Sequence, residues 1–202
     1  WTRYQTKRSQ AQSSQKVREL SQFQPKTLGQ INPGWPTASL VWVCVVGAFG
    51  ALTVTLKLFP AIVTLHLLGA LLLLALLTWQ VAYYAAVTHL AEKANARVVP
   101  QRLRTVLIIT FVLVWLQIAL GGWVSTNYAV LACNTFPACQ NSFWPDMNFA
   151  QGFSIWRELG LTSAGDNITF SALTAIHYTH RLSAYVVFIA LGYSAWLLAK
   201  VV

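Results

Sequence analysis

Charge is the scarcest property of this 202-residue sequence. Only 9% of the residues are Asp, Glu, Lys or Arg, and only five are acidic, whereas 56% are hydrophobic. A soluble domain usually carries about a quarter of its residues as charged side chains. Long stretches without charge are instead typical of helices that cross the hydrocarbon core of a membrane. The composition therefore excludes an ordinary soluble globular protein.

Four stretches of the sequence are apolar enough to span a bilayer, and none contains Asp or Glu. They are residues 36–56, 61–87, 105–125 and 176–198. Because about 20 apolar residues of helix cross a hydrocarbon core, we predict an all-α fold, a polytopic transmembrane bundle with four helices in this chain. The chain begins at Trp1 rather than Met and ends soon after the last stretch, so we expect a segment of a longer polypeptide.

The few basic residues gather in two segments that are almost free of acidic residues. Residues 1–35 carry six Lys and Arg against one Glu, and residues 88–104 carry four against one. The positive-inside rule places both in the cytoplasm, the second as a linker between a helical hairpin, residues 36–87, and the second helix pair, residues 105–202. The same rule accounts for the net charge of +9. We therefore expect no nucleic-acid partner.

The opposite side of the membrane is predicted to hold a long loop, residues 127–175, in which Arg157 is the only Lys or Arg. Cysteine is rare in the chain, yet Cys133 and Cys139 lie six residues apart in this loop. In the oxidising periplasm of a bacterium such a pair favours a disulfide. A zinc site is the alternative, although the loop contains no histidine or third cysteine. Apolar residues within 149–161 are spaced as in a short interfacial amphipathic helix.

Three of the four histidines lie in predicted membrane helices. His66 lies in the second apolar stretch, and His177 and His180 lie three residues apart near the start of the fourth. An imidazole in hydrocarbon needs a partner that stabilises it, and we predict that the partner is haem iron. Helix rise places His66 and His180 in the same outer half of the bilayer. The alternative for His66 is a hydrogen-bonded core histidine. His89, at the cytoplasmic end of its stretch, is expected to have no role.

Two neighbours of His180 are further candidates for cofactor binding. His177 shares a helix face with His180, and could support the ligand, carry protons or replace a different residue type. Arg181 is expected at the headgroup level, where its guanidinium could hold a haem propionate in a bidentate pair. The alternative for Arg181 is a cation that extends to the membrane surface.

Several motifs around these residues together resemble the haem A synthase family. The segments TVTLKLFP and VTLHLLG, at residues 53–60 and 63–69, are similar to the junction of the family's third and fourth helices. The segment LGGWVSTNYA at residues 120–129, the cysteine pair, FWP at 143–145 and HYTHRL at 177–182 are similar to its fifth and sixth helices and the loop between them. The resemblance covers nearly all of the chain beyond the basic segment.

The resemblance implies an eight-helix protein with pseudo-twofold symmetry, of which this chain supplies helices three to six. His66 would then be a haem ligand of the first half and His180 of the second, with partner histidines on helices two and eight. The family carries a glutamate three residues before its helix-two histidine, and the equivalent position in the second half is His177. Since the predicted spans contain no acidic residue, no catalytic residue is assigned. The second site is instead expected to hold haem b.

The implied function is oxidation of a methyl group of haem o to the formyl group of haem a, for cytochrome oxidase assembly. The implied location is a bacterial inner membrane, with the amino-terminal segment cytoplasmic. The expected partners are membrane lipid, haem o, the haem o synthase and a further copy of the chain. Two alternatives remain: a di-haem b-type membrane cytochrome that only transfers electrons, and a haem-free bundle that serves as a transporter or an assembly scaffold.

Overall fold

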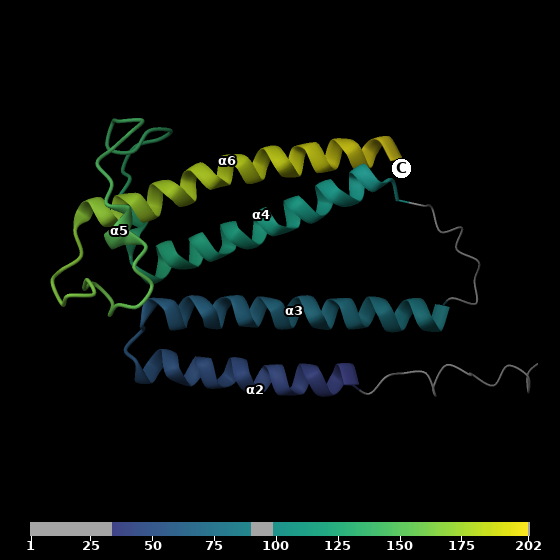
Figure 1. Ribbon diagram of the computed structural model, residues 1–202. Helices are drawn as coiled ribbons and strands as arrows, with labels where there is room; N and C mark the ends of the chain where they lie inside the picture. The colour runs from purple at the N-terminus through teal and green to yellow at the C-terminus, as the bar shows by residue number, and fades with distance from the viewer. Residues whose placement is uncertain (1–33, 90–98, 202) are drawn as a thin grey trace, which may run out of the picture.

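The computed structural model describes residues 34–89 and 99–201, and these residues form helices with no strand among them (Figure 1). Four helices are long and apolar enough to cross a membrane, which confirms the predicted all-α membrane bundle. They are α2 (Gly34–Thr55), α3 (Pro60–His89), α4 (Gln101–Thr126) and α6 (Phe170–Val201). The expectations for residues 1–33 and 90–98 concern positions outside the described residues.

The four long helices form two antiparallel pairs. Helix α2 packs on α3, α4 packs on α6, and α3 contacts α4 between the pairs. Figure 1 shows that α3 and α4 approach each other at the end that carries the long loop and separate toward the opposite end. The close approach is set by Gly122 of α4, where a Cβ atom would lie only 3.0 Å from Leu67 Cδ2 of α3.

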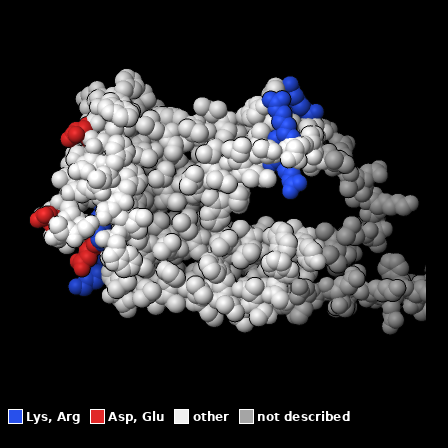
Figure 2. Space-filling view, viewed as in Figure 1, with Lys and Arg blue, Asp and Glu red and all other residues white. Residues whose placement is uncertain are grey.

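Polar side chains join the helices within each pair. In the first pair, Gln80 Nε2 donates to Ser39 Oγ at 2.5 Å, and in the second, Thr110 Oγ1 and Ser194 Oγ lie 2.8 Å apart. Ser, Thr and Gln side chains commonly form hydrogen bonds between membrane helices. On the face shown in Figure 2, the charged side chains of the described residues lie toward the two ends of the molecule, and the middle of the helices is uncharged. The chain is therefore a multi-pass membrane protein.

Helix α6 begins at Phe170, six residues before the start expected from its apolar stretch. The preceding Thr169 caps it, because its Oγ1 accepts a hydrogen bond from Ala172 N at 3.3 Å. A threonine at this position satisfies a main-chain N–H that has no partner within the helix. The loop between α4 and α6 therefore ends at residue 169 rather than 175.

The amphipathic helix predicted over residues 149–161 is wrong, because only α5 (Phe149–Gly152) is helical there. The Trp123 indole Nε1 donates to Gly152 O at 3.0 Å, and so takes the carbonyl group that the next helical turn would use. Gly152 also presses on α6, where a Cβ atom would lie 2.7 Å from Ala172 O. Contacts with α4 and α6 thus end the helix after one turn.

Candidate functional site

His66 lies on α3 with its ring against α2. Its Nδ1 atom is 3.0 Å from the main-chain oxygen of Val46. A carbonyl oxygen can only accept, so Nδ1 carries the proton and Nε2 keeps its lone pair. The ring also lies against Gly50, where a Cβ atom would be 3.1 Å from His66 Cε1. The tautomer and orientation of His66 are those of an imidazole that could bind a metal through Nε2.

An apolar groove of about 360 Å³ opens beside His66, which is the one ionisable side chain in its lining. The wall includes aromatic rings from both helix pairs: Trp42, Phe49 and Trp115. A second apolar groove, of about 510 Å³, runs between α3 and α4 and shares Trp115 with the first. A hydrophobic wall with one convergent polar group is typical of sites for large apolar ligands. The residues present therefore fit a haem macrocycle held by His66.

His180 lies on α6 with its ring against α4. A Cβ atom at Gly121 would be 3.1 Å from His180 Cε1, the same distance as between Gly50 and His66. Unlike His66, His180 contacts a side-chain amide, since Gln117 Nε2 lies 2.9 Å from its Nδ1 and 3.4 Å from its Nε2. The two histidines thus share a glycine contact but differ in the hydrogen-bond partner of the ring.

The structure places His66 and His180 on different helix pairs, and does not bring them into one site. Within residues 34–89 and 99–201, no group of three or more His, Cys, Asp or Glu side chains could hold a metal ion. The expectation that helices three to six carry one haem ligand for each half stays a prediction.

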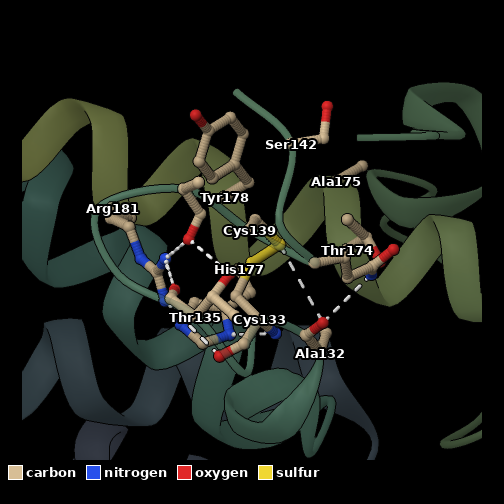
Figure 3. Close-up of a disulfide and its surroundings, with 12 residues drawn as sticks. Ala132, Cys133, Thr135, Cys139, Ser142, Thr174, Ala175, His177, Tyr178 and Arg181 are labelled. Atoms are coloured by element: carbon tan, nitrogen blue, oxygen red, sulfur yellow. Dashed lines mark hydrogen bonds between the residues drawn. A yellow bond between two sulfur atoms is a disulfide. The ribbon is translucent and has the colours of Figure 1, made fainter. Parts of the chain in front are cut away.

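Cys133 and Cys139 form the predicted disulfide, with their Cα atoms 4.6 Å apart. Helix α6 lies against this loop (Figure 3), where His177 Nδ1 accepts a hydrogen bond from Cys133 N at 3.3 Å. Gln140 reaches α6 from the loop and donates to Thr174 Oγ1 at 2.7 Å. His177 therefore contacts the disulfide loop rather than a cofactor-sized cavity.

Arg181 also binds the disulfide loop (Figure 3). Its Nη1 donates to the main-chain oxygens of Thr135 at 2.6 Å and Ala138 at 2.7 Å, and its Nη2 lies 3.5 Å from Cys133 O. The guanidinium also lies over the Phe136 ring, 5.8 Å from its centroid. The two Nη1 hydrogens are thus engaged, and the Nε hydrogen and one Nη2 hydrogen have no acceptor among these contacts.

Comparison with known proteins identifies the family. Residues 23–201 match the sequence profile of the COX15-CtaA family, described as cytochrome oxidase assembly protein. The chain belongs to the COX15-CtaA family. It is 35% identical over 138 residues to a haem A synthase of Shewanella oneidensis, a match that covers 68% of this chain and 41% of that protein.

Other curated relatives carry the same name. A haem A synthase of Methylobacterium radiotolerans is 32% identical over 130 residues, covering 64% of this chain and 31% of that protein. One from Methylobacterium sp. strain 4-46 is 31% identical over 146 residues, covering 68% and 40%. This COX15-CtaA chain thus spans about a third to two-fifths of the length of the curated relatives it matches. No solved structure matches it significantly.

Some residues around the candidate site were not predicted from the sequence. Gln117 and the Val46 carbonyl, the partners of the two histidines, lie on other helices, and nothing in the local sequence points to them. Arg157 is 3% exposed, donates to Asn127 Oδ1 and Leu161 O, and lies over the Trp123 ring at 5.8 Å. Burial lowers the pKa of the Arg157 guanidinium. The side chain joins the loop to the end of α4, where the helix dipole favours a cation.

Proposed function

We propose that this chain is the central part of a haem A synthase, which oxidises a methyl group of haem o to the formyl group of haem a. In this proposal His66 and His180 would each hold a haem, in different halves of the protein, and the haem at His180 would be haem b. The family membership supports the reaction class. The observation that carries the site is His66, whose Nδ1–H is held by Val46 O beside an apolar groove.

The residues of the first site orient the ligand and exclude water. Val46 O fixes the proton of His66 on Nδ1, which directs the Nε2 lone pair away from that hydrogen bond and raises the basicity of the ligand. Gly50 leaves room for the ring. Bound haem supplies the oxidation of an unactivated C–H bond, which side-chain acids and bases do not perform. The aromatic wall of the groove would keep water away from the macrocycle.

The residues of the second site lie between α4, α6 and the disulfide loop. His180 is the proposed ligand. His177, on the same face of α6, accepts a hydrogen bond from Cys133 N and so holds the disulfide loop against this helix. Arg181 has donors beyond those bound to Thr135 and Ala138, and we assign them to a haem propionate. The haem o synthase and a second copy of the chain stay predictions as partners.

We further propose a bacterial inner membrane with the basic segment in the cytoplasm and the disulfide loop in the periplasm. The disulfide supports this orientation because an oxidising compartment permits it. Figure 2 shows both acidic and basic side chains at the loop end and only Lys and Arg at the opposite end. The loop between α4 and α6 contains Asp146, Glu158 and Asp166, whereas α4 begins with Arg102 and Arg104. Basic residues favour the cytoplasmic side.

The test is a pyridine haemochrome spectrum, with chromatography of the extracted haems, on the full-length protein purified from membranes that contain haem o. Haem b together with haem o or haem a is expected. Haem b alone would favour an electron-transfer cytochrome, and absence of haem would favour a transporter or scaffold. His66→Ala and His180→Ala should each remove one haem component, while the matched control His89→Ala should remove none. Unchanged haem content in both variants would contradict the ligand assignment.

A further inference from the structure

The two apolar grooves near His66 are continuous with each other. The first lies mostly between α2 and α3 and the second between α3 and α4, and they share Leu68, Leu72 and Trp115. Leu68 and Leu72 lie one turn apart on one face of α3. They therefore form a ridge between two grooves that open on the same side of the three helices. A ligand in the first groove can extend a substituent over this ridge into the second.

The second groove accepts only apolar groups. Three residues of α3 and five of α4 line it, and none of them carries a charge or a hydroxyl group. They are Leu68, Leu72, Ala75, Phe111, Val112, Trp115, Leu116 and Ala119. A carboxylate is strongly disfavoured against such a wall in the middle of a membrane. The propionates of a haem are thus excluded from this groove, and a ring substituent that enters it has to be apolar.

The second groove also has room for a long chain. Its volume is about 510 Å³, and helix rise places Ala75 about 10 Å further along α3 than Leu68. Among the substituents of haem o, the isoprenoid chain is the one that is both apolar and long. The double bonds of this chain leave fewer rotatable bonds to immobilise than a saturated lipid chain has, which lowers the entropic cost of binding. The groove therefore suits the isoprenoid chain better than a lipid chain.

We propose that the groove between α3 and α4 holds the isoprenoid chain of haem o and so fixes the rotation of the ring at His66. This inference rests on the proposed function. A haem held only through Nε2 of His66 can rotate about the bond between that nitrogen and the iron. A chain held in the second groove removes this freedom, because the chain is covalently joined to one edge of the ring. The groove thus selects which methyl group is presented for oxidation, and favours haem o over haem b, which has no such chain.

The test uses the full-length protein purified from membranes that contain haem o and haem b, and follows the haem component that is lost in His66→Ala. Ala75→Phe and Ala119→Leu fill opposite ends of the second groove, from α3 and α4. Ala70→Phe is the matched control, because Ala70 is exposed on α3 and lines neither groove. Chromatography gives the ratio of the haems with the chain, o and a, to haem b. In the unsubstituted protein, haem o with a diazirine at the end of its chain is photolysed, and mass spectrometry locates the label.

Ala75→Phe and Ala119→Leu are expected to lower this ratio several-fold and Ala70→Phe to leave it unchanged, and the label should fall on residues that line the second groove. Label on lipid alone or elsewhere in the protein, or a ratio in both groove variants equal to that of Ala70→Phe, overturns the inference while the function stands. If the unsubstituted protein contains neither haem o nor haem a, the proposed function fails and the inference fails with it. The label keeps the test decisive where a groove variant does not fold, because it needs no substitution.

Discussion

Gly50 and His66 are in such close contact that a Cβ atom at Gly50 would lie 3.1 Å from His66 Cε1. Movement of the ring away from Gly50 would stretch the hydrogen bond from its Nδ1 to Val46 O, which is 3.0 Å long. A methyl group at Gly50 would therefore stretch this hydrogen bond or displace the ring by a few tenths of an ångström. The same contact recurs between Gly121 and His180, at the same distance.

The first prediction is that Gly50→Ala disturbs the haem component that depends on His66. Its content should fall several-fold in the purified full-length protein, measured by the haemochrome spectrum. Gly47→Ala is the matched control on the same helix, because a Cβ atom there meets nothing within 4 Å. Alanine in place of a helical glycine should raise the stability of that control by roughly 0.5–1 kcal/mol. Equal haem content in the two variants would show that the glycine contact has no part in positioning His66.

The second prediction concerns the thiols. Cys133 and Cys139 are linked, and Cys44 is free and exposed. Cys44 lies midway along the span α2, so the test uses a Cys44→Ser variant, which leaves the loop pair as the cysteines of residues 1–202. A maleimide reagent should label neither of them in non-reducing detergent and both after reduction and unfolding. Labelling of Cys133 or Cys139 in protein isolated without reductant would contradict a disulfide in the native loop.

The sequence predicts the membrane part of this fold well because the constraint is local. A helix that faces lipid needs an uninterrupted apolar stretch, so the four spans can be read directly from composition. Tertiary contacts decide the rest. Helix α5 ends after one turn because Trp123 binds Gly152 O, a contact between residues 29 positions apart. The period of the apolar residues after Gly152 cannot reveal a hydrogen bond made to another helix.

The residues of the candidate site also fall into those that the sequence predicts and those that only tertiary contacts reveal. His66, His180 and the cysteine pair stand out because their residue types are unusual in an apolar chain. Gln117 does not, since a single glutamine in a span has many structural uses and its partner His180 lies 63 residues away. The environment that distinguishes the two histidines is therefore available only from the packed structure.

The third prediction concerns the buried cation at the end of α4. Arg157→Met should lower the stability of the protein by about 1.5–3 kcal/mol, the usual range for a hydrogen bond to a charged group. The loss follows because Asn127 Oδ1 and the Trp123 ring face would lose their partner. The measurement is the thermal unfolding midpoint in detergent. Glu158→Gln, at the exposed neighbouring position, is the control and should leave the midpoint unchanged. A midpoint for Arg157→Met equal to that of the control would show that the guanidinium does not stabilise the loop.

The fourth prediction separates two uses of Arg181. Its guanidinium binds the carbonyl groups of Thr135 and Ala138, and its remaining donors are assigned to a haem propionate. Lysine keeps the charge but does not reproduce the planar fork of arginine. Arg181→Lys should therefore speed hydrogen exchange at the Cys139 and Ser142 amides, each of which donates to the main-chain oxygen of the other residue at 3.0 Å, while retaining haem.

Arg181→Gln should speed the same exchange and also lose haem, because the glutamine lacks the positive charge that attracts a propionate. Arg102→Gln is the control, since Arg102 contacts Tyr193 at the opposite end of the helices and should affect neither measurement. Haem loss in Arg181→Gln without faster exchange would mean that Arg181 acts on the haem alone. Faster exchange without haem loss would restrict Arg181 to holding the disulfide loop, and the propionate would then need another cation, from outside α6.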